Sequence, residues 1–203
     1  MNTTKKVLPE GAEGAKNELY PIFLKVNQLN IIIIGGGNVA LEKLTFLLKS
    51  SPNAKVALIA LDFSEEILAL AKKHDVLTMQ RPYTSNILHK QHIVIAATND
   101  NVVNTQIYKD AKQKQLLVNV ADTPHLCDFY LGGIVTKGNV KIAISTNGKS
   151  PTTAKRLRQF FEEVIPENID DMVKNLNSYR KTIKGNFEAK VKTLNKLTEG
   201  LLN

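Results

Sequence analysis

Cysteine and histidine are scarce in this sequence, and tryptophan is absent. The single cysteine, Cys127, excludes an intramolecular disulfide and a cysteine-rich zinc site. The four histidines form no His-Glu-x-x-His pattern, so we predict no protein-bound metal. Aromatic residues make up only 6% of the chain, which argues against a platform for stacked bases. The net charge of +8 comes from scattered lysines and arginines, so we expect no nucleic-acid partner and consider a polyanionic small substrate instead.

Long apolar runs are absent as well. None approaches the ~20 residues that a membrane-spanning helix needs, and the polar residues 1–6 are unlike the apolar core of a signal peptide. We therefore expect a cytoplasmic protein without membrane contact. A chain of 203 residues, 43% of them hydrophobic, can hold one nucleotide-binding domain and a smaller appendage.

The most prominent feature that is present is an alternation of strand and helix patterns. The unbroken apolar run at 30–34 is typical of a strand buried on both faces of a sheet. The alternation predicts an α/β fold with a doubly wound parallel sheet, the Rossmann architecture. An apolar segment at 20–24 is expected to be an edge strand or a packing segment. Further strands are expected at 55–60, 76–81, 93–97 and 116–120, with helices at 41–49, from residue 64 and at 101–113.

The pattern changes after residue 122. Two strands, 129–136 and 140–146, flank Lys137-Gly138-Asn139 and predict a β-hairpin. Ser150 and Pro151 are typical of a helix N-cap and first turn, and this helix should end before Pro166. The expected organisation is a polar leader at 1–19, a Rossmann domain at 20–122, a hairpin region at 123–150, and a helical C-terminal domain at 151–203.

A glycine-rich turn follows the first strand. Gly35, Gly37 and Ala40 fit the pattern G-x-G-x-x-A of dinucleotide-binding proteins. Gly35 permits the tight turn, Gly37 lets a pyrophosphate approach the backbone, and Ala40 lets the helix pack on the sheet. Asn38 and Val39 belong to the helix start, whose free N–H groups would face the phosphates. We predict NAD binding here; the alternative is a glycine turn kept only for packing.

Polar residues at two further strand ends are candidates for contact with the cofactor. Asp62 is the first acid after the strand at 55–60, where a carboxylate usually binds the ribose hydroxyls. Asp62 could equally be a solvated loop residue or a charge at the start of a helix. No arginine follows that strand to hold a 2′-phosphate, which favours NAD over NADP. Thr98 and Asn99 follow the strand at 93–97 and could bond the cofactor, or Asn99-Asp100 could simply cap the next helix.

Asp122 is the candidate for chemistry. It closes the fifth predicted strand, where a carboxylate can accept a proton while a hydride leaves the substrate. The alternative is a turn opener before Thr123-Pro124. Asn119 is either a ligand contact or a local backbone partner. His125 is a further candidate for substrate contact, although a lone histidine in a turn is usually a surface residue.

A loop before the predicted helix at 151 is a candidate site for an acidic substrate. Helix starts favour carboxylates through their dipole and their free N–H groups. Lysines and arginines nearby add positive charge, and the alternative is a solvated basic helix face. The residues that we expect to contact the substrate here are Ser145, Thr146, Lys149 and Ser150.

Two longer stretches make a family resemblance specific. They are VNVADTPHLCDFY at 118–130 and IAISTNGKSP at 142–151, and the glycine turn and AATND at 96–100 add to them. From residue 20 to about 165 the chain resembles the precorrin-2 dehydrogenase family. This family includes enzymes that are also sirohydrochlorin ferrochelatases, and the N-terminal half of fused siroheme synthase.

The resemblance implies oxidation of precorrin-2 to sirohydrochlorin with NAD⁺ in siroheme biosynthesis, and in bifunctional members the insertion of Fe²⁺ as a substrate. It also implies a homodimer with contacts exchanged through the hairpin region. The family's essential aspartate falls on Asp122 and accepts protons in both steps. The chain departs from the family at Asn147, Lys149 and Leu131-Gly132-Gly133. A dehydrogenase without chelatase activity and a non-catalytic NAD-sensing module stay open as alternatives.

Overall fold

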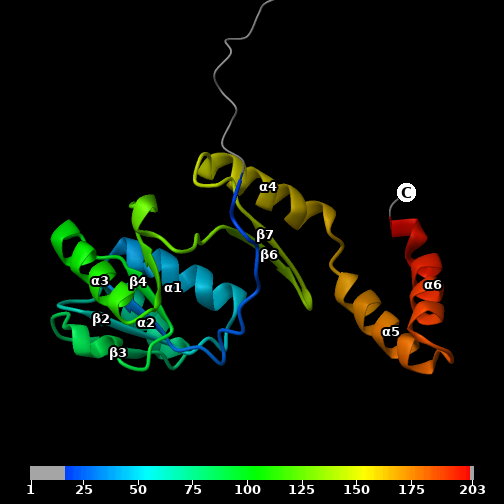
Figure 1. The fold of residues 1–203 in the computed structure, drawn as a ribbon, viewed down its shortest axis with the longest axis horizontal. Coiled ribbons are helices and arrows are strands. Elements are labelled where there is room, and N and C mark those ends of the chain that lie inside the picture. The colour runs from blue at the N-terminus through cyan, green and yellow to red at the C-terminus, as the bar shows by residue number, and fades with distance from the viewer. Residues whose placement is uncertain (1–16, 202–203) are drawn as a thin grey trace, which may run out of the picture.

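The computed structural model describes residues 17–201, which form a Rossmann-like body followed by a hairpin and three helices (Figure 1). Most of the predicted leader at 1–19 lies outside these residues. The strands are β1 (Ile31–Ile34), β2 (Val56–Ala60), β3 (Leu77–Gln80), β4 (Ile93–Ala96), β5 (Leu117–Val120), β6 (Gly133–Lys137) and β7 (Val140–Ile144). The α-helices are α1 (Asn38–Ser50), α2 (Glu65–Lys73), α3 (Asn101–Gln113), α4 (Pro151–Val164), α5 (Ile169–Thr182) and α6 (Phe187–Thr198). Short 3₁₀ turns are η1 (Ser85–Leu88), η2 (Pro124–Leu126) and η3 (Glu199–Leu201).

The first five strands form one parallel sheet in the order β3-β2-β1-β4-β5, which confirms the predicted doubly wound fold. Alternate isoleucines of β1 face opposite sides of the sheet. Ile31 and Ile33 pack toward the core that α1 and α2 cover, while Ile32 and Ile34 pack toward α3 and η1. Because both faces are covered, the strand is apolar at every position.

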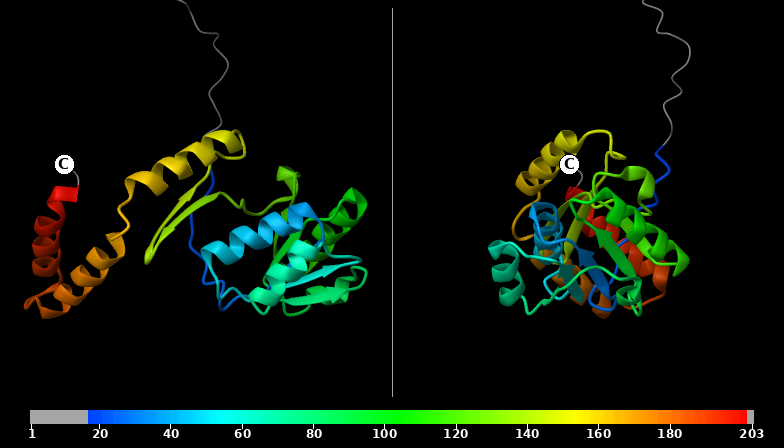
Figure 2. Two further views of the ribbon diagram at one scale, coloured as in Figure 1. Left: turned by 180° about the vertical axis from the view of Figure 1, so that it is seen from behind. Right: turned by 90° about the vertical axis from the view of Figure 1, so that its left-hand side faces the viewer.

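The hairpin β6–β7 is antiparallel (Figure 2), and contacts with α1 and α5 hold it near its turn. The ammonium group of Lys141 donates to the backbone carbonyl and the hydroxyl of Ser50, at the C-terminal end of α1. At the hairpin tip, the Asn139 amide N–H donates to the carboxylate of Asp170 in α5 at 2.7 Å. Lys174 pairs with the same carboxylate at 2.6 Å, and together these donors lower the pKa of Asp170 to about 2.

Several boundaries differ from the sequence prediction. The first helix begins at Asn38 rather than at residue 41, because Gly37 already occupies the N-cap position. The strand expected from 129 starts only at Gly133. Residues 20–24 form no strand, and their apolar side chains are exposed, so the expectation of an edge strand or packing segment is wrong within residues 17–201. The helical C-terminal domain expected at 151–203 consists of α4, α5 and α6 in the described residues, and the chain breaks between α5 and α6 at Gly185, whose φ is +110°.

Candidate functional site

The carboxyl ends of the parallel strands carry most of the predicted site. In the order across the sheet, β2 leads to Asp62, β1 to Gly35, β4 to Thr98 and β5 to Asp122. Ligands of open α/β sheets bind at this edge, where the order of strands reverses on either side of the first strand. The fold therefore brings these four positions to one edge.

Gly35 has no room for a side chain. Its amide N–H donates to the carbonyl of Ile59 at 2.9 Å, and its φ is +140°. A Cβ at this position would lie 2.2 Å from the carbonyl oxygen of Ala97. The turn after β1 is therefore wedged between the ends of β2 and β4, and only glycine fits there.

The next two glycines differ sharply in their surroundings. A Cβ on Gly36 would lie 1.8 Å from the backbone oxygen of Asp62 and 2.8 Å from the Cβ of Ala60. A Cβ on Gly37 would meet nothing within 4 Å. Gly36, to which the sequence analysis gave no role, is thus a packing glycine. Gly37 faces open space of the kind that a pyrophosphate occupies in dinucleotide-binding turns.

The start of α1 is built to receive an anion. Its N-cap, Gly37, offers no side-chain hydrogen bond, and the first turn holds no acidic residue. The first helical hydrogen bond runs from the Leu41 amide to the Gly37 carbonyl at 3.0 Å, so the N–H groups of Asn38, Val39 and Ala40 have no intrahelical acceptor. The side chain of Ala40 is fully buried against the sheet. These features fit the pyrophosphate of a dinucleotide.

Asp62 lies beside this turn. Its carbonyl faces Gly36, and its exposed carboxylate accepts a hydrogen bond from the amide of Phe63 at 3.0 Å. The helix-start role is filled by the next residue but one, because the hydroxyl of Ser64 caps α2. In the sequence no arginine follows β2, yet the structure places one there: the amide N–H of Arg81 donates to the carbonyl of Ala60 at 2.8 Å.

Thr98 is held by the buried side chain of Asn104 in α3. The Thr98 hydroxyl donates to the Asn104 amide oxygen at 2.7 Å, and the Asn104 NH₂ group donates to the Thr98 carbonyl at 3.0 Å. Asp100 caps α3 by accepting from the amides of Val102 and Val103. The capping role considered for Asn99-Asp100 thus falls to Asp100, which leaves the exposed Asn99 side chain at the strand end.

Asp122 has an unusual backbone. Its φ is +55°, a left-handed conformation that non-glycine residues seldom adopt, and its side chain is exposed. Within residues 17–201 its carboxylate forms no hydrogen bond or ion pair. Four other non-glycine residues of the described chain, Asp75 among them, also have a positive φ, so Asp122 is distinguished by its place at the carboxyl end of β5.

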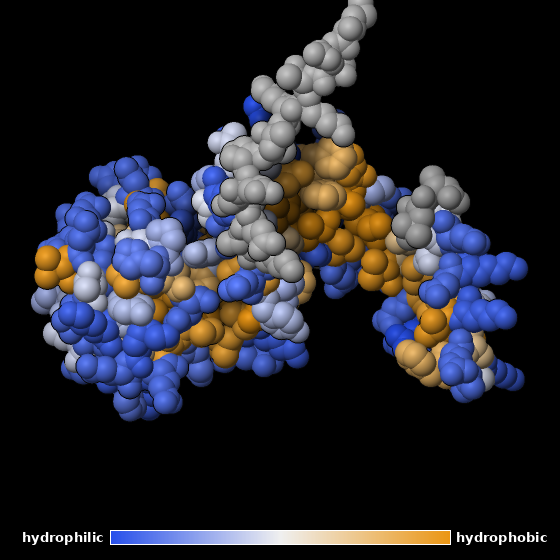
Figure 3. All heavy atoms as spheres, turned by 45° about the horizontal axis from the view of Figure 1, so that its top comes forward, coloured by the Kyte–Doolittle hydropathy of each residue, from blue (hydrophilic) through white to orange (hydrophobic). Residues whose placement is uncertain are grey.

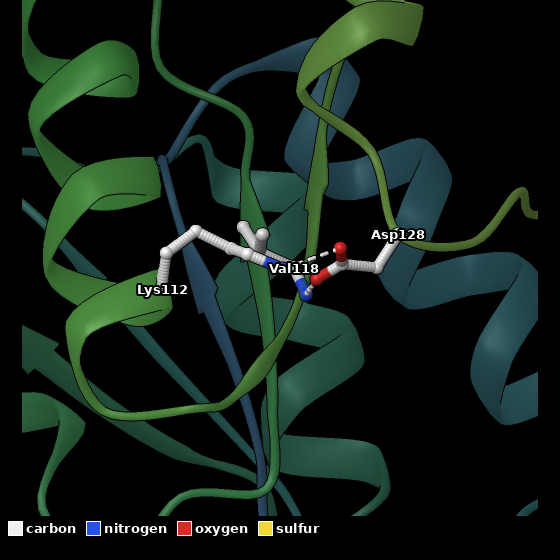
Figure 4. A network of polar contacts seen from close by, with 3 residues as sticks. All are labelled: Lys112, Val118 and Asp128. Carbon is white, nitrogen blue, oxygen red and sulfur yellow. Dashed lines mark hydrogen bonds and ion pairs between the residues drawn. The ribbon is translucent and has the colours of Figure 1, made fainter.

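Cys127 and Asp128 hold the loop that follows Asp122, and the sequence analysis gave neither residue a role. The Cys127 thiol accepts from the Val120 amide at 3.3 Å and donates to the Val120 carbonyl at 3.2 Å. Burial raises the pKa of this thiol. The Asp128 carboxylate accepts from the Val118 amide at 3.0 Å and pairs with Lys112 at 2.6 Å (Figure 4). The loop thereby covers the free edge of β5.

Asn119 belongs to the same brace. It is 6% exposed, and its NH₂ group donates to the carbonyl of Phe129 at 2.8 Å. The structure thus shows the local backbone bond that was one of its two predicted roles. His125 lies in η2 with an exposed side chain.

The loop before α4 is a tight turn. Asn147 and Gly148 both have positive φ, 54° and 72°, and the Lys149 amide donates to the Thr146 carbonyl at 3.0 Å. This is the geometry of a type I′ turn, which asparagine tolerates, so Asn147 suits the first central position of the turn. The Ser150 hydroxyl accepts from the Thr153 amide at 3.2 Å and caps α4.

The hydroxyl groups of Ser145 and Thr146 in this loop form hydrogen bonds, whereas the side chain of Lys149 is exposed. Thr146 donates to the Ser150 carbonyl at 3.0 Å, and Ser145 accepts from the Asn147 amide at 3.1 Å. Within the described chain, no hydrogen bond or ion pair joins this loop to the strand ends around Asp122. Polar contacts within the described chain therefore do not join the two parts of the predicted site.

Among residues 17–201, no group of three or more His, Cys, Asp or Glu side chains could hold a metal ion. In the same range, no helix is long and apolar enough to cross a membrane.

Comparison with known proteins shows which families and proteins this chain is similar to. Residues 22–133 match the family described as "Putative NAD(P)-binding", and residues 137–163 match the family described as "Sirohaem biosynthesis protein central". The siroheme synthase of Psychrobacter cryohalolentis is 37% identical over 175 residues, which is 86% of this chain and 32% of that protein. The siroheme synthase of Pseudoalteromonas translucida is 33% identical over 171 residues, 84% of this chain and 36% of that protein. The chain thus spans about a third of the length of these curated relatives.

A solved structure shares the fold. It is named SirC, precorrin-2 dehydrogenase, and superposes with a TM-score of 0.71 over 88% of this chain and 89% of its own. Because the two sequences are 21% identical, this likeness concerns the fold alone.

Proposed function

The chain belongs to the NAD(P)-binding family that its residues 22–133 match, and we propose that it oxidises precorrin-2 to sirohydrochlorin with NAD⁺. The observation that carries the proposal is the free carboxylate of Asp122, held in a left-handed backbone at the same sheet edge as the glycine turn. The siroheme synthase names of the relatives and the family resemblance of residues 118–130 support the choice of substrate.

Bound NAD⁺ would supply the acceptor for a hydride. The oxidation removes two electrons and two hydrogens from precorrin-2, one as that hydride and one as a proton. Asp122 accepts the proton on its carboxylate and, being exposed, returns it to solvent. The helix start at Gly37 would hold the pyrophosphate and the carboxylate of Asp62 the ribose, while Thr98 and Asn99 would contact the cofactor from the end of β4.

Precorrin-2 and sirohydrochlorin carry many carboxylates, and the chain offers positive charge to bind them. Lys149 is exposed in the turn before α4, and Lys155 and Arg156 are exposed on the first turns of that helix. The helix dipole adds to this field. Lys149 is the group in this loop that we expect to bind a substrate carboxylate, with Ser145 and Thr146 as hydroxyl partners.

We also propose that the active form is a homodimer. In the described residues, α4, α5 and α6 bury no side chain, and apolar side chains such as Leu157, Phe160 and Val164 are exposed. Figure 3 shows the apolar surface running from the hairpin region along α4 toward α5. A second copy would cover this surface and bring a lysine-bearing loop to the neighbouring strand ends. We also propose that the reaction takes place in the cytoplasm.

Insertion of Fe²⁺ into sirohydrochlorin remains a further prediction from the family resemblance. Metal insertion releases two pyrrole protons, and Asp122 is the carboxylate that we expect to accept them. Adding Fe²⁺ and sirohydrochlorin to the protein tests this step directly. A rate equal to that without protein would mean that the chain is a dehydrogenase only.

The Asp122→Asn variant tests the proposed mechanism. Asparagine tolerates the same left-handed backbone, so fold and NAD⁺ affinity should be kept. Turnover of precorrin-2 should fall by about 100-fold or more, because general-base groups contribute about 10²–10⁴-fold. The matched control is Asp75→Asn: Asp75 is also exposed, with a φ of 54°, but it lies in the turn before β3, at the other edge of the sheet. Wild-type turnover in Asp122→Asn would refute the assignment of Asp122 as the base. Wild-type protein that binds NAD⁺ but never oxidises precorrin-2 would favour a sensing module.

A further inference from the structure

Arg81 is the residue that the strand pairing brings to the adenosine side of the dinucleotide site. It follows β3 directly, and its amide N–H donates to the carbonyl of Ala60 at 2.8 Å. Ala60 ends β2, two positions before Asp62, and its Cβ lies beside Gly36. In Rossmann folds the adenosine ribose binds at this end of the second strand. Arg81 therefore lies beside the ribose position although it is remote from the glycine turn in sequence.

The guanidinium group of Arg81 is available to a ligand. Its side chain is exposed, and the guanidinium donates to the sulfur of Met79 at 3.9 Å. No carboxylate lies within ion-pair distance of it among residues 17–201. The following segment is fixed, because the hydroxyl of Tyr83 donates to the carboxylate of Asp110 in α3 at 2.8 Å. Arg81 thus presents an unpaired positive charge from an anchored backbone.

We propose that Arg81 binds the 2′-phosphate of NADP⁺, so that this site accepts NADP⁺ as well as NAD⁺. The guanidinium fork suits a phosphate because it can donate two parallel hydrogen bonds. Asp62 acts in the opposite sense, since its carboxylate accepts from the free ribose hydroxyls of NAD⁺ and repels a 2′-phosphate. The two residues together set the cofactor preference. The inference rests on the proposed function only in requiring that the site bind a dinucleotide.

Calorimetric titration of the full chain with NAD⁺ and, separately, with NADP⁺ tests the assignment. Arg81→Ala should weaken NADP⁺ binding about 10- to 100-fold, the loss expected for a charged hydrogen bond, and NAD⁺ binding by less than about threefold. Asp62→Asn should shift the ratio of the two affinities toward NADP⁺. The matched control is Arg180→Ala in α5, which removes the same charge from the far helical part of the chain (Figure 1). Adenosine 2′-monophosphate and adenosine 5′-monophosphate serve as fragment probes, and only the first should respond to Arg81→Ala.

Three results would overturn the proposal. Wild-type protein that binds NAD⁺ but not NADP⁺ would show that Arg81 does not reach the phosphate. Equal weakening of both dinucleotides in Arg81→Ala would mean that Arg81 contacts the adenosine part that both share. A chain that binds neither dinucleotide would refute the proposed function itself, and this inference with it.

Discussion

Gly36 and Gly37 stand next to each other, yet the structure predicts opposite consequences when each is replaced by alanine. A methyl group on Gly36 would lie 1.8 Å from the Asp62 carbonyl oxygen and 2.8 Å from the Ala60 Cβ. Neither neighbour is the end of a flexible side chain, so the glycine turn and the end of β2 must separate. Overpacking of this kind costs about 1–3 kcal/mol in the free energy of unfolding.

Gly37→Ala is the matched comparison. The added methyl meets no protein atom within 4 Å, and the φ of −103° suits alanine. Stability should fall by no more than about 1 kcal/mol, the difference between glycine and alanine at an N-cap. The same methyl stands where the pyrophosphate approaches the backbone, so we expect NAD⁺ affinity to fall about tenfold or more, or about 1.4 kcal/mol.

Thermal unfolding without cofactor and calorimetric titration with NAD⁺ separate the two effects. Gly36→Ala should lower the midpoint by about 2–12 °C, since 1 kcal/mol corresponds to about 2–4 °C for a chain of this size. Gly37→Ala should unfold within about 4 °C of the wild type. Unchanged stability of Gly36→Ala, or unchanged NAD⁺ affinity of Gly37→Ala, would refute the division of roles between these glycines.

Two further predictions concern stability. Asp128→Ala should lower the free energy of unfolding by about 1–3 kcal/mol, because it leaves the amide of Val118 without an acceptor. Lys112→Ala removes only the partly exposed ion pair and should lower that free energy by about 1 kcal/mol or less, as measured by denaturant unfolding. Equal losses in the two variants would contradict the view that the bond from Asp128 to the Val118 amide stabilises the fold more than the ion pair does. The pKa of Asp170 is lowered from 3.8 to about 2 by Lys174 and the hairpin tip, so its contribution to stability is present above pH 3.8 and lost as the pH falls toward 2. Asp170→Asn should therefore unfold more easily than wild type at neutral pH, and that difference should shrink toward pH 2; a difference independent of pH would argue against an ionic role.

The sequence predicted the layered architecture because each signal was local. The run at 31–34 is apolar at every position because both faces of the sheet are covered, and Ser64 and Ser150 cap the helices expected to follow them. The predicted ends were least accurate where distant contacts decide. Residues 129–132 were expected to be strand, but Asn119 holds the Phe129 carbonyl, and a Cβ on Gly132 would lie 2.2 Å from the Ile144 carbonyl oxygen.

The grouping of the candidate site residues at one sheet edge was predicted for the same reason. Gly35, Gly37 and Asp122 lie within three residues of a strand end, so the pattern of strands was enough to bring them to one edge. Arg81 was given no role, because it lies beside β2 only through the pairing of β2 with β3. Cys127 and Asp128 stood within a motif that resembles a family, but their hydrogen bonds to β5 could not be read from residue types.

The central claim is that this chain transfers a hydride from precorrin-2 to NAD⁺. The most direct measurement is an anaerobic reaction of purified protein with precorrin-2 and NAD⁺, followed by the absorbance of sirohydrochlorin and of NADH together. The account predicts that the two products appear in equal amounts and that neither forms without the protein. Sirohydrochlorin that forms without NADH, or a reaction no faster than the protein-free control, would contradict it.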